Sequence, residues 1–421
     1  MPDNYKTKYD TLKQQDSHKA YQEDLAFAKE LNILRNDFYY QMMGVKNLSL
    51  VDFLYQPLEI MSGDAYSARK IDEYKTFYIV VDGMGKGLSA SLSAMIMTSF
   101  INHIVDKMLQ YDSFSLDIVI KESLEYIQPI LLDDEALAID YILFDTYFNK
   151  LSYAKFAMPP FLIEDKDDNI VKIKSNNPPL SKWQKDFKVD TVDIQNYEKF
   201  LFYSDGIVEN SSKESGKTYA DFIIEDFRYS FTKEEFKHKI FNNIAQQEDD
   251  LTMIFINKLN FDDTSIIQKT FNSTLDAVDE AVAWYEELWL GLTDDATIIY
   301  QTNLTFTELF MNAYEHGNLG ITSHEKNKLL QNDEYFDELK KREKQTDKKI
   351  VVKVDRIKNI TSEYIVTQIQ DDGDGFDTKI LETIFRNTQK FNGRGVYVSR
   401  KNSMGIYYNL KGNSVLFLNK I

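Results

Sequence analysis

Four short acidic segments, three of them next to an apolar run with the alternation of a β-strand, most constrain what this chain can fold into. The segments are Ser62-Gly63-Asp64, Val80-Val81-Asp82-Gly83, Tyr203-Ser204-Asp205-Gly206 and Glu248-Asp249-Asp250-Leu251-Thr252. A single Asp-Gly pair is ordinarily a turn. Four such segments in order predict one rim of carboxylates, provided that the strands share a sheet.

Carboxylates that gather at one rim repel one another, and a bound cation is the usual remedy. The chain has no cysteine, and oxygen ligands without histidine or thiolate favour Mg²⁺ or Mn²⁺. Two such ions about 3.5–4 Å apart can hold a phosphate group and activate a water molecule for attack on phosphorus. The segments therefore predict hydrolysis of a phosphate ester without a nucleophile from the protein.

The pattern along the chain predicts an α+β protein of two or three domains, because 421 residues are too many for one ordinary core. We expect an N-terminal helical region over 1–47, with a helix from about 17 to 42, a mixed domain over 48–258, a linker over 259–272 and a second domain over 273–421. In the mixed domain, the pattern predicts strands at 76–81, 138–145 and 199–203, and helices at 87–109, 115–129 and 232–246.

The second domain begins with helices. Ser273 is a candidate N-cap for a helix that runs to about Leu290, and a second helix is expected over 295–316. A charged stretch follows, and then come strands at 350–356 and 362–370, a glycine-rich region and a helix near 394–401.

Charge and hydropathy exclude two classes of partner. The net charge of −18 argues against a surface that coats nucleic acid. No apolar run approaches the roughly 18–20 residues that span a bilayer, and the N-terminus lacks the apolar core of a signal peptide. We therefore expect a cytoplasmic protein with no nucleic-acid partner and no membrane partner.

The acidic segments, read as SGDAY, FYIVVDGMGKGLSASLSAMIM, LFYSDGIVEN and EDDLTMIFI, resemble the PPM family of metal-dependent protein phosphatases. The likeness is to the bacterial branch of sporulation stage II and stress-response phosphatases, and it covers about 50–258. It implies an αββα sandwich. Met158 stands where that family commonly has a histidine that is not a metal ligand.

The same resemblance implies two Mn²⁺ or Mg²⁺ ions in this domain. The implied ligands are Asp82 for both ions, Asp64 and the Gly83 carbonyl for one of them, and Asp205 and Asp249 for the other. Asp250 is left open as the alternative to Asp249.

Three further motifs follow in the second domain. They are Glu308-Leu309-Phe310-Met311-Asn312-Ala313-Tyr314-Glu315-His316-Gly317, Asp371-Asp372-Gly373-Asp374-Gly375-Phe376 and Gly393-Arg394-Gly395-Val396. Glu308 and Asn312 are four residues apart and so share one helix face. An asparagine oxygen suits Mg²⁺, and a glutamate one turn earlier can accept a proton. Glycines that open a helix expose N–H groups to a phosphate.

In this order the motifs resemble the GHKL (Bergerat) ATPase superfamily, in the branch of the anti-sigma serine kinases, over about 273–421. The resemblance implies an α/β sandwich that binds ATP with Mg²⁺. The implied roles are catalytic base for Glu308, Mg²⁺ ligand for Asn312, adenine recognition for Asp371, and nucleotide-binding pocket and lid for Gly373, Gly375, Gly393, Arg394 and Gly395. The stretch 318–349 is either a helical hairpin for partner contact or an exposed insertion, and we favour the insertion.

Together, the resemblances imply control over the phosphorylation of a small partner. In the leading interpretation, the first domain dephosphorylates a STAS-type anti-sigma antagonist, and the second phosphorylates the same partner or binds a sigma factor. Alternatively, the second domain is a nucleotide sensor or a module that sequesters a partner. A histidine kinase is disfavoured, because none of the five histidines lies in a helix directly before residue 273. Dimerisation through the N-terminal helix or the phosphatase domain is left open.

Overall fold

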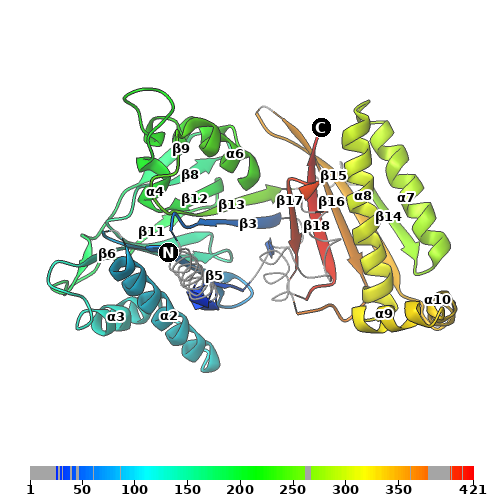
Figure 1. The fold of residues 1–421 in the computed structure, drawn as a ribbon, viewed down its shortest axis with the longest axis horizontal. Coiled ribbons are helices and arrows are strands. Elements are labelled where there is room, and N and C mark those ends of the chain that lie inside the picture. The colour runs from blue at the N-terminus through cyan, green and yellow to red at the C-terminus, as the bar shows by residue number, and fades with distance from the viewer. Residues whose placement is uncertain are drawn as a thin grey trace, which may run out of the picture. The chain divides into compact units, whose positions relative to one another are not determined.

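The computed structural model describes residues 25–26, 29–30, 32–37, 40–43, 47–59, 61–85, 87–260, 267–360, 362–377, 399, 401–409 and 411–421. Contacts divide these residues into two compact units (Figure 1). The first holds the described residues within Met1–Asp37, Asp52–Arg228 and Lys237–Ile256, and the second holds those within Phe38–Val51, Tyr229–Phe236 and Asn257–Ile421. The domain limits expected from the sequence stay a prediction.

A seven-stranded sheet forms the centre of the first unit, in the order β1-β4-β5-β6-β7-β11 with β10 beside β6. Its strands are β1 (Arg35–Asn36), β4 (Asp64–Lys70), β5 (Lys75–Gly83), β6 (Ala136–Asp145), β7 (Lys150–Phe156), β10 (Leu180–Ser181) and β11 (Asp190–Asp193). The strands pair antiparallel, except that β1 pairs parallel with β4. Because β5 is covered on both faces, its sequence is a nearly continuous apolar run.

A six-stranded sheet has the order β2-β3-β13-β12-β8-β9. Its strands are β2 (Tyr40–Met43), β3 (Asn47–Gln56), β8 (Phe161–Asp165), β9 (Ile170–Ile173), β12 (Tyr197–Tyr203) and β13 (Leu251–Asn260). In the first unit, Phe144 of β6 packs edge-on against Phe200 and Phe202 of β12, with ring centroids 5.0 and 6.0 Å apart. The two sheets therefore pack face to face around an aromatic core.

The helices of this part of the chain are α2 (Leu88–Gln110), α3 (Leu116–Ile127), α4 (Asp205–Glu209), the 3₁₀ turn η1 (Tyr219–Asp221), α5 (Ile223–Arg228) and α6 (Lys233–Asn243). Helices α2 and α3 cover the outer face of the seven-stranded sheet (Figure 1). Met97 and Ile101 of α2 are fully buried with Ile79 and Val81 of β5 in one core. The observed mixture of sheets and helices confirms the predicted α+β class.

Helix α2 corrects one expectation. By length and composition it could cross a membrane, with a mean hydropathy of 1.4 over its most apolar window. The sequence led us to expect no such segment, because small polar residues such as Ser93 and Thr98 interrupt the apolar letters. These residues are themselves buried, and 61% of the window is buried inside the protein, as in the core helix of a globular unit. The cytoplasmic location stays a prediction.

In the second unit, a five-stranded antiparallel sheet has the order β14-β15-β16-β18-β17. The strands are β14 (Ile267–Asn272), β15 (Lys349–Lys358), β16 (Glu363–Asp371), β17 (Gly405–Tyr408) and β18 (Ser414–Lys420). Helices α7 (Leu275–Leu290) and α8 (Ala296–Asn312) lie side by side against it (Figure 1). Tyr285 of α7 stacks on Phe306 of α8 at 4.0 Å, and its hydroxyl lies 2.9 Å from Thr367 Oγ1 of β16. Thr274, rather than Ser273, caps α7 by accepting from the Ala277 N–H.

The stretch after α8 is packed rather than loose. A π-helical turn, η2 (Ala313–Asn318), continues α8, and α9 (Ser323–Gln331) and α10 (Tyr335–Glu343) form a hairpin. Glu315 of η2 is 1% exposed and accepts hydrogen bonds from the Tyr335 hydroxyl and from Lys326 Nζ. The Tyr314 hydroxyl donates to Glu343 Oε1 at 2.6 Å. Most residues of 322–349 are nevertheless exposed, and α9 has no buried residue, so the exposed insertion and the contact with a partner both stay predictions.

The N-terminal helix is shorter than expected. Residues 25–26, 29–30 and 32–33 are helical, but β1 and β2 occupy 35–36 and 40–43. Leu34 is buried in the core, and β1 pairs with β4, so tertiary pairing overrides the local helical pattern. The earlier part of the predicted helix, before residue 25, lies outside the described residues.

Candidate active site

The first two acidic segments meet across one pair of strands. Asp64 begins β4 and Asp82 lies near the end of β5, and the antiparallel register places them directly opposite each other. Opposite residues in such a pair have Cβ atoms about 4.5–5.5 Å apart. Asp64 is 3% exposed, and its Oδ2 accepts a 2.6 Å hydrogen bond from the Ser204 hydroxyl. The Gly83 N–H donates to the Gly63 carbonyl at 2.9 Å.

The other two acidic segments come from neighbouring strands of the six-stranded sheet. Asp205 begins α4 shortly after β12, and Asp249 and Asp250 directly precede β13. The chain is so close here that a Cβ on Gly206 would lie 1.9 Å from the Asp250 carbonyl oxygen. Only glycine fits at position 206, so this close approach accounts for the Asp-Gly pair.

A cavity of about 250 Å³ is lined by residues from all four segments. Its lining consists of Leu58, Glu59, Met61, Gly63, Asp82, Gly83, Met84, Gly85, Gly87, Ser91, Asp205, Glu209, Asp249 and Asp250. The structure thus brings together five of the six metal-ligating residues that were predicted in the first domain, and the sixth, Asp64, lies opposite Asp82. Gly87 and Ser91 belong to the start of α2, whose N-terminus carries a partial positive charge.

The carboxylates of this cavity suppress one another's ionisation. Burial, together with the negative charges of Asp64 and Asp205, raises the pKa of Asp82 to about 10. Burial also raises the pKa of Asp64, against the hydrogen bond from Ser204. A set of carboxyl groups in this condition gains stability from any bound positive charge that lets them ionise.

The residues present fit a divalent cation by their chemistry. All the polar side chains that the four segments aim at the cavity carry oxygen, the donor that Mg²⁺ and Mn²⁺ prefer. Across the described ranges, no group of three or more His, Asp or Glu side chains is arranged to hold a metal ion as it stands. Asp64 accepts from the Ser204 hydroxyl, and Asp250 accepts from the N–H groups of Leu58 (2.7 Å) and Gly63 (2.6 Å).

The sequence did not point to several residues of this site. Glu209 lines the cavity four residues after Asp205, so both lie on one face of α4, and that spacing was a readable signal. Ser204, which holds Asp64, precedes Asp205 directly. Glu59 also lines the cavity, but nothing in its neighbourhood marked it.

In the second unit, Glu308 and Asn312 share one face of α8, as their spacing predicts. Asn312 Nδ2 donates to Glu308 Oε1 at 3.4 Å. The negative charge of Glu308 contributes, after burial, to raising the pKa of Tyr408 on β17. Both side chains are half-buried.

Asp371 ends β16 and is buried against a glycine-lined turn. Its Oδ1 accepts from the Gly373 N–H at 2.8 Å, and its backbone N–H donates to the Asn413 carbonyl at 3.0 Å. A Cβ on Gly317 would lie 2.4 Å from the Asp371 carboxyl carbon, so the end of η2 reaches this carboxylate only because position 317 is glycine. Burial raises the pKa of Asp371 to about 6, although the Gly373 N–H and Lys411 act against it.

Of the remaining residues predicted for the nucleotide site, the structure describes Gly375 but not the Gly393–Gly395 segment. Gly375 has a φ of +79° and packs against the Lys411 carbonyl, where a Cβ would lie 1.8 Å away. Gly393, Arg394 and Gly395 lie outside the described residues. Gly317, Lys411 and Asn413 surround Asp371. Gly317 ends the motif that begins at Glu308, whereas no role in the site was predicted for Lys411 and Asn413.

Comparison with known proteins finds sequence matches for the part of the chain that contains the acidic cavity. Residues 72–258 match the model of the family described as Stage II sporulation protein E (SpoIIE). This match contains Asp82, Asp205, Asp249 and Asp250, whereas Asp64 precedes it. Phosphoserine phosphatase RsbP of Bacillus subtilis (strain 168) is 24% identical over 165 residues, which are 38% of this chain and 40% of that protein.

Solved structures resemble the chain at low similarity. The RsbU and RsbW domains of Rv1364c from Mycobacterium tuberculosis match with a TM-score of 0.44 and 13% identity over 89% of this chain and 94% of that one. RsbX in complex with magnesium matches with a TM-score of 0.39 and 16% identity over 53% of this chain and 100% of that one. Such low scores indicate nothing about activity. Residues 72–258 are thus similar in sequence to the SpoIIE family and, in part, to a phosphoserine phosphatase, within a longer chain.

Proposed function

We propose that this protein is a metal-dependent phosphoserine and phosphothreonine protein phosphatase with an ATP-binding domain at its C-terminal end. The observation that carries the proposal is the cavity at which Asp82, Asp205 and Asp249 meet, inside the stretch with the SpoIIE-type sequence. The match to RsbP covers only 40% of that protein, so activity, substrate and partner are all part of the proposal.

Asp82, the Gly83 carbonyl, Asp64, Asp205 and Asp249 would hold two Mn²⁺ or Mg²⁺ ions. The ions supply Lewis-acid polarisation of the phosphoryl group and a nucleophilic water. We favour Asp249 over Asp250 because both Asp250 oxygens already accept backbone N–H groups. The start of α2 would direct N–H groups at the substrate phosphate. The residues of the cavity thus bind and orient the phosphorylated side chain.

The proposed substrate is a small phosphorylated STAS-type anti-sigma antagonist. With this phosphoprotein and Mn²⁺, the full chain is expected to release the phosphate, and mass spectrometry of the partner measures the loss. Excess EDTA is expected to reduce the release to background, because the carboxyl groups alone offer no nucleophile. Undiminished activity in EDTA would exclude the proposal.

For the second unit we propose that it binds ATP with Mg²⁺. Asn312 would be a Mg²⁺ ligand, and Asp371 would recognise the adenine. The residues around the nucleotide would be Gly373, Gly375, Gly393, Arg394 and Gly395. Support comes from the buried Asp371 carboxylate beside the close-packed Gly317 and Gly373. In the leading version, Glu308 is the base of a serine kinase that acts on the same partner, or this unit binds a sigma factor, or it does both. In the alternative, this unit only senses nucleotide or sequesters a partner.

Asp371→Asn is expected to weaken binding of ATP·Mg²⁺ by about tenfold, because it offers an N–H where the adenine amino group needs an acceptor. Titration calorimetry on the full chain measures the affinity. Asp347→Asn, at a nearby exposed carboxylate, serves as the matched control. Equal affinities in the wild type and Asp371→Asn would exclude Asp371 as the base-reading residue.

The same pair of proteins should differ in pH dependence. The pKa of Asp371 is raised from 3.8 to about 6, with Lys348 and Lys411 opposing the rise and Asp372 adding to it. The ionised acceptor is thus lost as the pH falls through about 6, so wild-type affinity declines below that value. Asp371→Asn lacks this part of the decline and keeps only the part due to ATP itself.

A further inference from the structure

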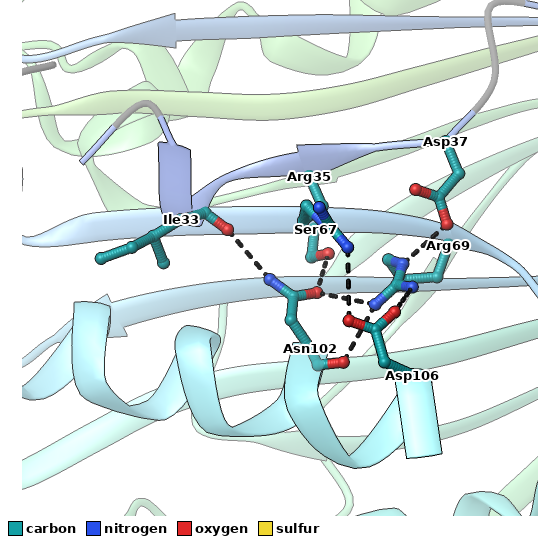
Figure 2. A network of polar contacts seen from close by, with 7 residues as sticks. All are labelled: Ile33, Arg35, Asp37, Ser67, Arg69, Asn102 and Asp106. Carbon is teal, nitrogen blue, oxygen red and sulfur yellow. Dashed lines mark hydrogen bonds and ion pairs between the residues drawn. The ribbon is translucent and has the colours of Figure 1, made fainter. Parts of the chain in front are cut away.

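The N-terminal segment is anchored on the strand that carries Asp64. Residues 35–36 form β1, which pairs with β4, and the Asp37 N–H donates to the Ala68 carbonyl at 2.9 Å. Arg69 of β4, 2% exposed, donates to Asp37 Oδ2 at 2.7 Å and to the Asn102 carbonyl on α2 at 3.1 Å (Figure 2). Segment, strand and helix are therefore joined by one buried guanidinium.

Figure 2 also shows that α2 donates a hydrogen bond directly to the backbone of this segment. Asn102 Nδ2 donates to the Ile33 carbonyl at 2.9 Å, while its Oδ1 accepts from the Ser67 hydroxyl at 2.6 Å. Arg35 reaches Asp106 of α2, the residue that also pairs with Arg69. With Leu34 buried in the core, residues 33–37 are fixed, and they fix in turn the helical residues just before them.

Glu30 is the residue of this N-terminal segment that contacts the chain just before Asp64. It is 1% exposed, and its Oε1 accepts from the Tyr55 hydroxyl and, at 3.0 Å, from the Ser62 N–H. The Tyr55 hydroxyl also lies 3.3 Å from the Asp64 carbonyl. Burial raises the pKa of Glu30, opposed by these two donors. Its Oε2 is buried without a hydrogen-bond partner among the described residues.

The chain between β3 and β4 is thus held from two sides. Glu30 accepts a hydrogen bond from the Ser62 N–H, and Asp250 accepts hydrogen bonds from the N–H groups of Leu58 and Gly63. Leu58 and Gly63 line the acidic cavity, and Asp64 follows Gly63 directly. Loss of the Glu30 acceptor would leave the buried Ser62 N–H unpaired and the Tyr55 hydroxyl with only its 3.3 Å bond to the Asp64 carbonyl. A folded protein avoids an unpaired buried donor by moving it.

We infer that Glu30 is a positioning residue for the acidic cavity: as a hydrogen-bond acceptor from an anchored N-terminal segment, it sets the place of Ser62, Gly63 and Asp64. The inference rests on the proposed metal-dependent phosphatase function and adds a residue outside the 72–258 match to its site. Glu30 does not touch the substrate. It acts through Ser62 and Tyr55.

Two replacements that are similar in size to glutamate distinguish the loss of the hydrogen-bond acceptor from a change in side-chain volume. Glu30→Leu fills the space without accepting, whereas Glu30→Gln keeps an oxygen for Ser62 and Tyr55. On the full chain, Glu30→Leu is expected to bind Mn²⁺ about tenfold more weakly by calorimetry, with a similar fall in kcat for phosphate release. Glu30→Gln is expected to stay within about twofold of wild type in both measurements.

Amide hydrogen exchange of Ser62 and Gly63 in the metal-free chain gives a readout that needs no activity. Exchange is expected to rise in Glu30→Leu and not in Glu30→Gln. Glu164→Leu, which breaks a buried ion pair with Lys199 elsewhere in the unit, destabilises the fold and is expected to leave Mn²⁺ affinity unchanged.

The outcomes distinguish the inference from the function on which it rests. A wild-type chain that releases no phosphate overturns the proposed function, while the exchange at Ser62 still decides whether Glu30 holds the loop. Unchanged exchange or unchanged Mn²⁺ affinity in Glu30→Leu overturns the inference. Equal losses in Glu30→Leu and Glu30→Gln, or in Glu164→Leu, also overturn it, because they indicate shape or stability rather than the acceptor.

Discussion

Asp82→Asn is expected to lower metal-dependent phosphate release by at least about 100-fold, since even residues that only support metal ligands cost 10–100-fold when replaced. Asp82 faces Asp64 across β4 and β5 and interacts with the charges of Asp205 and Asp249. Removing it takes away the one carboxylate proposed to serve both ions. Phosphate release from the phosphopartner, measured over a range of Mn²⁺ concentrations, gives the effect.

A matched series identifies the cause of that loss. Asp133→Asn changes an exposed carboxylate that pairs with Lys182, and it is expected to retain full activity. Asp249→Asn should fall with Asp82→Asn. Asp250→Asn should fall less, because an asparagine oxygen still accepts one of the N–H groups of Leu58 and Gly63. Full activity in Asp82→Asn would remove the basis of the metal assignment.

Glu308→Gln is expected to keep ATP binding and to lose about 10²–10⁴-fold in phosphotransfer, the usual worth of a general base. The reason is that Glu308 lies 3.4 Å from Asn312 on one face of α8, as a base and a metal ligand should. The assay must use an Asp82→Asn background, because an active phosphatase domain would erase the product. Mass spectrometry of the partner and calorimetry with ATP·Mg²⁺ give the two quantities.

Glu286→Gln, at an exposed position of the neighbouring α7, is the control and should leave phosphotransfer unchanged. If the Asp82→Asn chain with Glu308 intact yields no phosphopartner while ATP still binds, the second unit is a sensor or a sequestering module. That result would favour the alternative to the kinase.

The sequence predicted the parts of the site in which a carboxylate adjoins a strong strand pattern. Asp82 follows an unbroken apolar run, and the opposite placement of Asp64 follows once β4 and β5 form a hairpin. Glu30 could not be predicted, because a lone glutamate in a helical pattern looks like a solvated residue. Its role depends on Tyr55, 25 residues away in the chain, and on the burial that tertiary packing provides.

One error has a physical origin. Strand β1 has only two residues, too few for alternation to register, and its pairing with β4 ended the expected N-terminal helix early. The helical character of the α9–α10 hairpin was left open, because its sequence is highly charged. Its few buried contacts, at Tyr335 and Leu339, are spaced four apart but are outnumbered by Lys and Glu.

The attachment of this hairpin limits how the chain can be shortened. Glu315 is buried and accepts hydrogen bonds from Tyr335 and Lys326. Deleting residues 323–343 would therefore remove both donors and uncover this carboxylate, so a shortened chain would have a new polar surface at this place and not merely a shorter loop.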